Sequence, residues 1–379
     1  MTDFSAIPSP CYVIEEQLLR NNLAVIRAVA QAADVEIILA FKGFAMWSVF
    51  PTVREYISGA TASSLHEARL CAEKMGVRAH TYAPVYAPDE FGEIVRLSSY
   101  LTFNSLSQYA QLYSYAKTVA NPPEIGLRIN PEFSDVGVAL YNPALPGSRL
   151  GITAEHLHSL PDGVTGLHFH TLCESSAEDL EKTLAVVEQK FGHLFPQIHW
   201  LNMGGGHLMT RKGYDTDRLI TLLRSFHKKY PHIHIILEPG SAFAWETGFL
   251  RCTVLDIVEN HGIKTAMLDV SFAAHMPDCL EMPYQPAIRG ASMQPVANAF
   301  KYRMGGNSCL SGDWCGDWWF DRELHPGDDI ILEDMIHYTM VKTTFFNGIR
   351  HPAIGIIHTD GRFKLVRRFG YDDYRNRLS

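Results

Sequence analysis

The sequence lacks the features that mark membrane proteins, disulfide frameworks and nucleic-acid-binding proteins. No apolar run approaches the ~20 residues needed to cross a bilayer, and the opening MTDFSAIPSP lacks the basic start and apolar core of a signal peptide. The formal net charge is -8, with no long run of one sign, which disfavours a nucleic-acid partner. The seven cysteines are odd in number and scattered, which indicates reduced thiols. We therefore expect a cytoplasmic protein without a nucleic-acid or membrane partner.

What is present is the composition of a globular protein with a large core, since 46% of the 379 residues are apolar and 20% are charged. Short apolar runs alternate with amphipathic stretches, and each of the first seven runs is followed by a stretch that can form a helix. The runs span 36–42, 60–63, 79–84, 100–104, 124–130, 166–171, 199–205 and 232–240.

This alternation predicts an α/β fold, namely a (β/α)8, TIM-like barrel. A doubly wound open sheet is the competing architecture. Apolar residues at helical spacing predict helices over 177–191 and 217–230. Ser64 and Glu67 have the spacing of a capping box, which predicts a helix beginning there.

After about residue 245 the sequence pattern changes. Runs typical of β-strands are separated by Gly, Pro and Asp, and there is little helical periodicity. These runs span 249–260, 264–272, 328–340 and 353–360, and 10–16 could join the same sheet. We therefore predict a barrel domain over 15–245 and a second, mainly β domain formed by 1–14 and 246–379.

Residues able to carry chemistry fall at the carboxyl ends of the predicted strands, which is the active face of a β/α barrel. Lys42 ends the first strand, and His168 and His170 face the same way on the sixth. The others are Arg128 on the fifth strand, Gly204, Gly205 and Gly206 after the seventh, and Glu238 at the end of the eighth. The strands were not placed by these residues, so the clustering supports the barrel independently.

Each of these residues also has a plainer interpretation. A lysine at a strand end is usually solvated, but apolar flanks predict a partly dry Lys42 whose amine is free to form an imine. The glycines could form a simple turn or a phosphate cradle. The pairs His168/His170 and His232/His234 could bind a metal, but no further ligand stands at metal spacing, so we expect none. Glu238 could be structural, or could accept from a cationic ring nitrogen.

Together these residues resemble the alanine racemase-like, fold-type III enzymes that use pyridoxal 5'-phosphate. Within that group the chain resembles the decarboxylases of ornithine, arginine and diaminopimelate, and most of all the carboxynorspermidine/carboxyspermidine decarboxylases. The resemblance runs from about residue 9 to residue 348. Its specific motifs are AHMPD (274–278), LEMPY (280–284) and SCLSGD (308–313).

The resemblance implies a role for each matching residue. Lys42 would hold the cofactor as a Schiff base, and His170 would stack on its ring. Glu238 would pair with the ring nitrogen, which favours decarboxylation over racemisation, and Arg128 would orient the site. The phosphate would be held by Gly204, Gly205, Gly206, Ser241 and Tyr338. Cys309 would reach into the neighbouring subunit's site and protonate the substrate carbon, so a homodimer with shared active sites is implied, in which the β domain contributes to the interface and the site.

Three positions depart from the family pattern. Ser241 stands where the Glu-Pro-Gly-Arg motif has its phosphate-binding arginine, and Cys173 replaces the serine of the His-x-x-Ser motif. Leu310 follows Cys309, where ornithine and diaminopimelate decarboxylases carry an acidic residue. This last difference argues against those two substrates.

The expected substrate is therefore a small carboxylated polyamine, carboxynorspermidine or carboxyspermidine, decarboxylated to norspermidine or spermidine in polyamine biosynthesis. Diaminopimelate or arginine decarboxylation on the same scaffold is the alternative. The cationic tail needs acidic or aromatic contacts. The acidic candidates are Asp269, Asp313, Glu281 and Asp278, with Trp314 and Tyr284 nearby in the sequence. A cofactor-binding protein without catalysis and a metal-dependent barrel hydrolase are more distant alternatives.

Overall fold

A computed structural model describes residues 6–379 of the chain, which divides into two compact units. One unit comprises Asn22–Phe243, and the other combines Met1–Asn21 with Ala244–Ser379. The predicted β domain begins with 1–14, and residues 1–5 of that range lie outside the described part. The first unit is called the barrel unit below and the second the β unit.

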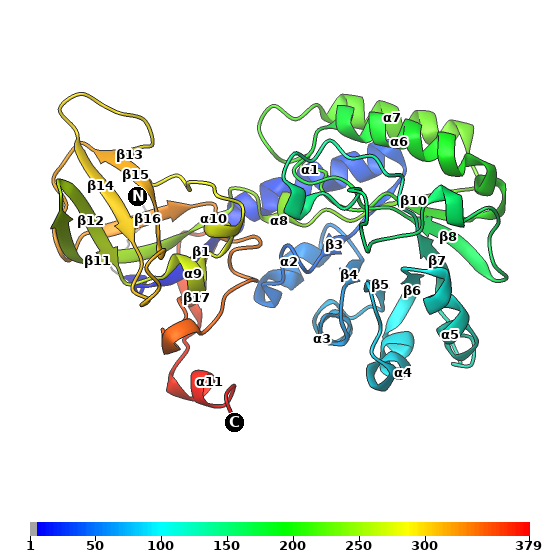
Figure 1. The fold of residues 1–379 in the computed structure, drawn as a ribbon, viewed down its shortest axis with the longest axis horizontal. Coiled ribbons are helices and arrows are strands. Elements are labelled where there is room, and N and C mark those ends of the chain that lie inside the picture. Colours follow the sequence, from blue (N-terminus) through cyan, green and yellow to red (C-terminus); the bar gives the residue numbers. More distant parts are fainter. Residues whose placement is uncertain (1–5) are drawn as a thin grey trace. The chain divides into compact units, whose positions relative to one another are not determined.

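The barrel unit contains a parallel sheet in the order β2-β10-β9-β8-β7-β6-β5-β4-β3 (Figure 1). Its strands are β2 (Glu36–Ile37), β3 (Leu39–Ala40), β4 (Ala60–Ala62), β5 (Ala79–Tyr82), β6 (Ser98–Phe103), β7 (Glu124–Arg128), β8 (Val164–His168), β9 (Trp200–Asn202) and β10 (His234–Leu237). Its helices are α1 (Glu16–Ala33), which begins in the β unit, α2 (Phe50–Arg54), α3 (Leu65–Leu70), α4 (Pro88–Leu97), α5 (Leu106–Ala116), α6 (Ala177–Phe191), α7 (Thr216–Lys229) and α8 (Ser241–Ala244).

The two ends of this sheet meet in a single stretch of chain, which closes the barrel. β2 and β3 are separated only by Ile38, and β2 pairs with β10 while β3 pairs with β4. The backbone N–H of Ile38 donates to Leu237 O at 2.9 Å, so the pairing with β10 continues across the break. The nine strands therefore form one closed barrel, and the predicted fold class is confirmed.

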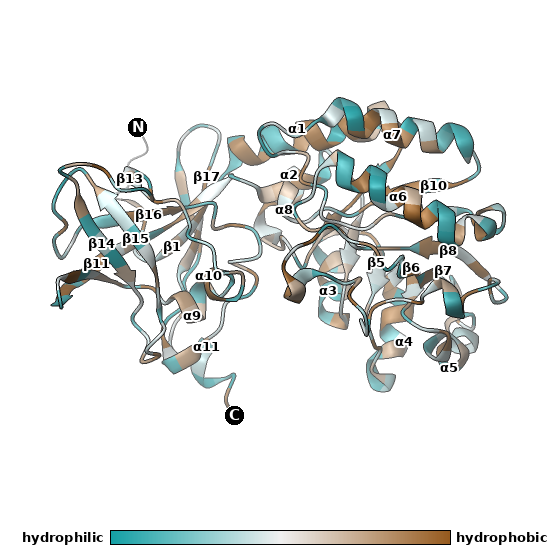
Figure 2. Cartoon of the chain, turned by 45° about the horizontal axis from the view of Figure 1, so that its top comes forward, coloured by the Kyte–Doolittle hydropathy of each residue, from teal (hydrophilic) through white to brown (hydrophobic). Residues whose placement is uncertain are grey.

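The predicted helices are confirmed with one exception. α6 covers the predicted 177–191, and Ser64 Oγ accepts from Glu67 N at 3.2 Å at the start of α3. Figure 2 shows hydrophilic and hydrophobic residues alternating along α7, as its periodicity predicts, and Figure 1 shows α6 and α7 side by side. The helix expected after 124–130 is wrong. Only short 3-10 turns connect β7 to β8, because prolines and glycines interrupt the segment that follows Pro131.

The β unit is built on a sheet in the order β13-β15-β14-β12-β11-β1-β17-β18, with β16 paired to β11. Its strands are β1 (Cys11–Glu15), β11 (Gly248–Asn260), β12 (Ile263–Leu268), β13 (Ala291–Ser292), β14 (Phe300–Gly305), β15 (Trp314–Phe320), β16 (Asp329–Glu333), β17 (Ala353–Ile357) and β18 (Phe363–Arg367). Short helices α9 (Phe272–His275), α10 (Asp278–Glu281) and α11 (Tyr371–Arg375) complete it.

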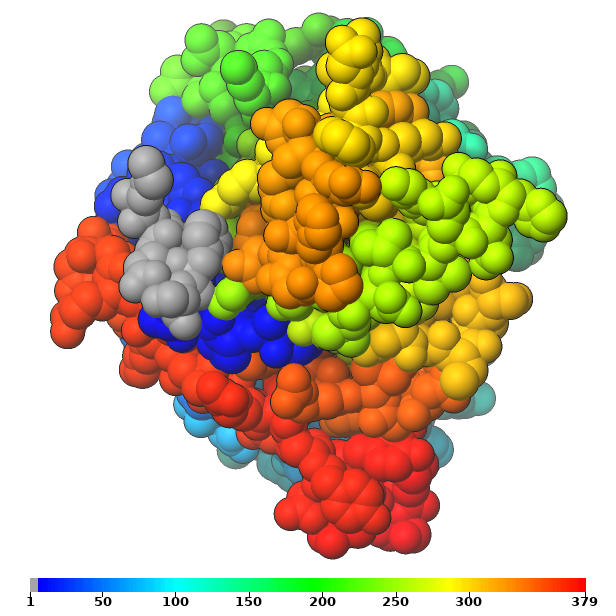
Figure 3. All heavy atoms as spheres, turned by 90° about the vertical axis from the view of Figure 1, so that its left-hand side faces the viewer, coloured from blue at the N-terminus to red at the C-terminus, as the bar shows by residue number. Residues whose placement is uncertain are grey.

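The early strand joins this late sheet, as the sequence predicts. β1 pairs antiparallel with β11 and parallel with β17, and Figure 3 shows the dark-blue early segment among late segments in red and orange. A buried cluster that includes Cys11, Val13, Phe249 and Ile357 holds the strands together. The long 328–340 run is a strand only over β16, since it ends at Glu333.

Candidate active site

Lys42 follows β3 at the carboxyl end of the barrel, where the exits of β3 and β10 meet. Ala40 N donates to Pro239 O at 3.1 Å. A Cβ placed on Gly43 would lie 2.7 Å from Gly240 Cα, so this approach requires glycine. The Lys42 amine lies 3.0 Å from His170 Nε2, and burial lowers its pKa below the ordinary lysine value.

The hydrogen bonds of His170 show whether His170 Nε2 or Lys42 Nζ donates the hydrogen in the contact between them. Gly205 N donates to His170 Nδ1 at 3.0 Å, so Nδ1 is an acceptor. A neutral imidazole then carries its hydrogen on Nε2, which donates to Lys42 Nζ. Burial also holds the pKa of His170 well below its usual range, consistent with a neutral ring. Lys42 must therefore present a lone pair, as a free nucleophilic amine does.

Glu238 lies just beyond the end of β10, with both carboxylate oxygens engaged. His168 Nε2 is 3.1 Å from Oε1, and because a carboxylate only accepts, His168 is the donor. Asn202 Nδ2 donates to Oε2 at 3.1 Å. Burial raises the pKa of Glu238, but its interaction with His168, including the hydrogen bond, opposes burial, and the resulting pKa lies well below its ordinary value. Glu238 is thus a buried, ionised acceptor.

The glycine loop after β9 packs tightly against its neighbours. A Cβ on Gly205 would lie 2.5 Å from Glu238 O, and Gly204 and Gly206 adopt φ of +74° and +89°. Asn202 Oδ1 accepts from Gly204 N at 2.8 Å. The loop therefore lies directly beside His170 and Glu238, and close packing alone already requires its glycines.

Arg128, at the end of β7, supports the same group of residues. Its Nη2 donates to His170 O at 3.0 Å, and its guanidinium stacks over Tyr82 at 4.7 Å from the ring centroid. Tyr82 Oη donates to Asn104 Oδ1 at 2.8 Å. Sequence reasoning missed Tyr82 and Asn202 as site residues, although both are the last residues of barrel strands, which was the signal that could have found them.

Ser241 begins α8 three residues after Glu238, at the same strand exit. The predicted residues of the barrel unit are thus brought to one rim. They comprise Lys42, Arg128, His170, Gly204, Gly205, Gly206, Glu238 and Ser241.

The acidic residues expected to read a polyamine tail lie in the β unit, where two of them hold its own backbone. Asp313 accepts from Ala273 N at 2.9 Å and from Ser308 N at 3.0 Å, and only 4% of it is exposed. Asp269 accepts from Thr253 N and from Ser9 Oγ, both at 2.8 Å. These contacts give the two carboxylates structural partners.

The other two acidic residues lie on α10 and share a lysine. Lys342 Nζ is 2.5 Å from Asp278 Oδ1 and also pairs with Glu281. The Glu281 side chain is 45% exposed, against 14% for that of Asp278. Glu281 is therefore the more accessible of the two carboxylates.

Cys309 and Tyr338 also belong to the β unit. Cys309 is exposed, and its backbone N–H donates to Asn347 Oδ1 at 2.8 Å. The other six cysteines of the described chain are buried or partly buried. Tyr338 adopts φ +36°, a conformation that L side chains rarely take, so the local backbone orients it at some cost.

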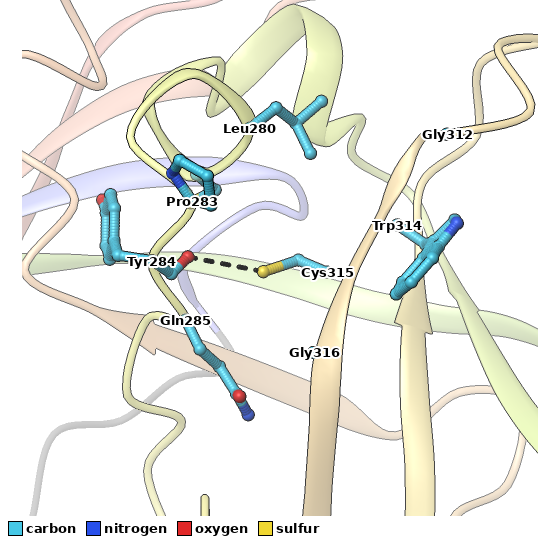
Figure 4. A pocket seen from close by; sticks show the side chains of 9 residues that line it. Leu280, Pro283, Tyr284, Gln285, Gly312, Trp314, Cys315 and Gly316 are labelled. Carbon is cyan, nitrogen blue, oxygen red and sulfur yellow. Dashed lines mark hydrogen bonds between the residues drawn. The ribbon is translucent and has the colours of Figure 1, made fainter. Parts of the chain in front are cut away.

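A cavity of about 380 Å³ lies within the β unit, between α10 and β15 (Figure 4). Figure 4 shows Cys315 pointing to the backbone oxygen of Tyr284, which its Sγ contacts at 3.5 Å. The cavity is lined by Cys279, Leu280, Pro283, Tyr284, Gln285, Gly312, Trp314, Cys315 and Gly316. It thus joins two of the motifs singled out in the sequence.

Among residues 6–379, no group of three His, Cys, Asp or Glu side chains could hold a metal ion. His168 bonds to Glu238, and His234 pairs with Glu36 at the opposite end of the barrel strands. No helix in this part of the chain is long and apolar enough to span a membrane.

One rim of the β/α barrel carries a free lysine amine, a neutral histidine and a buried anion. Together with the β domain, this set of groups is that of an enzyme that uses a carbonyl cofactor. The family model for the pyridoxal-dependent decarboxylase, C-terminal sheet domain, matches residues 11–336. The chain therefore belongs to the pyridoxal-dependent decarboxylase family, and pyridoxal phosphate is its cofactor.

Curated relatives cover nearly the whole chain. A carboxyaminopropylagmatine decarboxylase from Synechocystis is 54% identical over 376 residues, covering 99% of this chain and 96% of the relative. A carboxynorspermidine/carboxyspermidine decarboxylase from Campylobacter jejuni is 42% identical over 382 residues, covering 98% of both chains.

Solved structures show the same arrangement. Carboxynorspermidine decarboxylase from Campylobacter jejuni, complexed with norspermidine, matches with a TM-score of 0.91 and 40% identity over 98% of this chain and 100% of the other. Diaminopimelate decarboxylase from Helicobacter pylori, complexed with L-lysine, has a TM-score of 0.82 over 99% and 98% of the two chains. At 18% identity, this second likeness shows the fold alone.

The residues of the barrel unit fit this cofactor. The aldehyde needs an unprotonated amine, and the hydrogen bonds of His170 leave Lys42 in that form. The ring nitrogen needs an anionic partner, and Glu238 is buried and ionised. The protein is thus a pyridoxal-dependent decarboxylase.

Proposed function

We propose that the substrate of this decarboxylase is carboxyaminopropylagmatine, a carboxylated polyamine whose far end is a guanidinium group. The observation that carries this choice is the 54% identity to the Synechocystis enzyme of that name, against 42% to the carboxynorspermidine/carboxyspermidine enzyme. The sequence motifs taken alone favour carboxynorspermidine or carboxyspermidine. These remain the second candidate, supported by the TM-score of 0.91 to the norspermidine complex.

The reaction class rests on the rim of the barrel. When bound, pyridoxal phosphate supplies an electron sink for the pair of electrons left on carbon when carbon dioxide departs. Lys42 would hold the cofactor through its amine, and His170, whose Nδ1 is fixed by Gly205, would lie against the ring. The ionised Glu238 would keep a proton on the ring nitrogen, which maintains the sink.

The phosphate would lie at the loop formed by Gly204, Gly205 and Gly206, with Ser241 and Tyr338 as hydroxyl donors. Backbone N–H groups beside positive-φ glycines suit an anion. Because the N–H groups of Gly204 and Gly205 already donate to Asn202 and His170, Gly206, with φ +89°, is the member of the loop whose N–H would meet the phosphate. A serine replaces the arginine of the family motif, so this pocket uses neutral donors in place of a charge.

We also propose a homodimer with two shared active sites, in which Cys309 of one subunit serves the other. The thiol of Cys309 would deliver the proton that replaces carbon dioxide. Its exposure in the β unit is compatible with that role. Glu281 is our candidate to meet the cationic tail. Its side chain is 45% exposed and therefore remains accessible, although it pairs with Lys342.

The test is side-by-side turnover of carboxyaminopropylagmatine, carboxynorspermidine, carboxyspermidine, diaminopimelate and arginine, measured as carbon dioxide released. We expect the highest kcat/KM for the first, with Lys42→Ala losing both activity and the visible absorbance of the cofactor. Lys182→Ala, at an exposed lysine of the same unit, is the control for substitution alone. A higher kcat/KM for either carboxylated spermidine homologue would reverse the order of our two candidates. Turnover confined to diaminopimelate or arginine would overturn both.

A further inference from the structure

Asn202 lies between the glycine loop and the carboxylate that is to meet the cofactor. Its Nδ2 donates to Glu238 Oε2 at 3.1 Å, and its Oδ1 accepts from Gly204 N at 2.8 Å. A carboxylate can only accept and a backbone N–H can only donate, so one amide orientation satisfies both hydrogen bonds. The side chain is only 5% exposed, so breaking either hydrogen bond would leave a buried polar group without a partner.

We propose that Asn202 is a positioning residue that couples the glycine loop to Glu238 and holds that carboxylate in its ionised, oriented form. The proposal deepens the proposed function, because it depends on Glu238 facing the ring nitrogen of the cofactor. Asn202 touches neither substrate nor cofactor in this scheme and acts through Glu238. Through its hydrogen bond with Gly204 N, the same amide fixes the start of the proposed phosphate loop.

The space around Glu238 leaves little room for a water molecule beside Asn202. A cavity of only about 10 Å³ borders His168, Asn202 and Glu238 from inside the barrel. A water molecule needs at least that much space and two or more polar partners. A leucine at position 202 is close to asparagine in size and adds little room for a water molecule, so Glu238 Oε2 would lose its donor in Asn202→Leu.

Several titratable groups face Glu238, and any pH effect must be assigned against them. They are Lys42 after β3, His80 and Tyr82 on β5, His168 and His170 at the exit of β8, and His207 in the glycine loop. Among the hydrogen bonds of residues 6–379, Asn202 Oδ1 accepts from Gly204 N, and no side chain of these titratable groups does so. Substitution of Asn202 therefore changes the loop hydrogen bond and the carboxylate hydrogen bond together.

Two variants separate these hydrogen bonds. Asn202→Leu removes both, whereas Asn202→Asp keeps the acceptor for Gly204 but removes the obligatory donor to Glu238. Asn130→Leu is the matched control, because Asn130 is 4% exposed, follows β7, which lies two strands away from β9 in the sheet, and accepts from Glu132 N. Glu238→Gln identifies the signal of the carboxyl group.

The first readout is the infrared band of protonated carboxyl groups in the cofactor-free protein, followed against pH. We expect Asn202→Leu to raise the apparent pKa of Glu238 by about one to two pH units, the size expected for removing a hydrogen bond to a charged group. Asn202→Asp should add a coupled carboxyl pair whose shared proton persists to higher pH. Both signals should vanish when Glu238→Gln is added, and Asn130→Leu should leave the titration unchanged.

The second readout uses the holoenzyme, with the ring nitrogen of the cofactor labelled with ¹⁵N. We expect Asn202→Leu to lose ring-nitrogen protonation at lower pH than wild type, with kcat down about 10- to 100-fold, a size typical of supporting contacts. Cofactor affinity should fall in Asn202→Leu but stay within a fewfold of wild type in Asn202→Asp, which keeps the hydrogen bond from Gly204. If Asn202→Leu fails to fold, Asn202→Asp still tests the carboxyl titration.

An unchanged carboxyl titration in both variants would overturn the inference, as would a wild-type ¹⁵N shift in Asn202→Leu. Failure of the proposed function looks different. In that case the infrared titration would still respond to Asn202, while wild-type protein released no carbon dioxide from any carboxylated polyamine.

Discussion

The two units carry the residues singled out in the sequence in different ways. In the barrel unit these residues contact one another, so that Lys42, His170, Gly205 and Arg128 form a continuous chain of hydrogen bonds. In the β unit, Asp269 and Asp313 instead accept from backbone N–H groups of that unit, which belong to Thr253 on β11, Ala273 on α9 and Ser308 before β15.

This difference has a geometric cause. The carboxyl ends of parallel strands must converge on one rim, so residues at those positions meet whatever their identity. The motifs of the β unit lie in connections between strands, on the short helices α9 and α10 and in the turn between β14 and β15. A carboxylate there is as useful for accepting from backbone N–H groups as for binding a ligand. A motif in that unit therefore marks a position without fixing what its side chain does.

The sharpest way to test the barrel network is Glu238→Gln. A neutral amide cannot hold a proton on the ring nitrogen, so we expect kcat to fall on the order of 10²- to 10³-fold with KM changed little. Steady-state kinetics on the best carboxylated polyamine measures this. Glu36→Gln is the control, because Glu36 begins β2 at the opposite end of the barrel and pairs with His234. A loss of less than tenfold would mean that the network around Glu238 is structural.

The corresponding substitution in the β unit is Asp313→Ala. It would leave Ala273 N and Ser308 N without their acceptor in a buried turn, which we expect to lower the free energy of unfolding by about 2–3 kcal/mol. Denaturant unfolding of the holoenzyme checks this, and KM of the folded fraction should be nearly unchanged. A large rise in KM at constant stability would show that Asp313 reads the substrate, and the contrast between the units would fail.

The same contrast explains which features the sequence could predict. Alternating runs and strand-end positions sufficed for the barrel, for the joining of β1 to the late sheet and for the rim that unites Lys42 with Glu238. The helix expected after β7 is wrong because the alternation of runs does not outweigh the prolines and glycines that follow Pro131. Asn202 and Tyr82 were overlooked because an amide and a phenol at strand ends suggest no chemistry until their partners are known. The roles of Asp269 and Asp313 depend on backbone N–H groups, which one-dimensional patterns do not reveal.

The pH dependence of cofactor capture tests the protonation state of Lys42. Because burial lowers its pKa, the amine is protonated only below that lowered value and free above it. The rate of cofactor binding to the cofactor-free protein should rise about tenfold per pH unit below the lowered pKa and then level off. Stopped-flow absorbance measures this rate.

The same shift affects stability, with a defined sign. Between the lowered and the ordinary pKa of lysine, the unfolded chain binds more protons at Lys42 than the folded chain, so this group's contribution to the free energy of unfolding increases with pH. Lys42→Met should flatten that increase. A binding rate that levels off only near the ordinary lysine pKa would show that the amine is charged, contrary to the hydrogen bonds of His170.

The smallest expected effect belongs to Glu281→Gln in the β unit. Glu281 is paired with Lys342 at the surface, and exposed ion pairs contribute about 0–1 kcal/mol, so the free energy of unfolding should change by less than 1 kcal/mol. If Glu281 meets the cationic tail through solvent, KM for a carboxylated polyamine should rise about two- to fivefold at constant kcat, and less so at high salt. Asp278→Asn, at the less exposed partner of the same lysine, should alter KM less. Unchanged KM in both variants would exclude a charged contact to the substrate from either acid of α10. Tail recognition would then have to come from other side chains, such as the uncharged ones that line the cavity between α10 and β15.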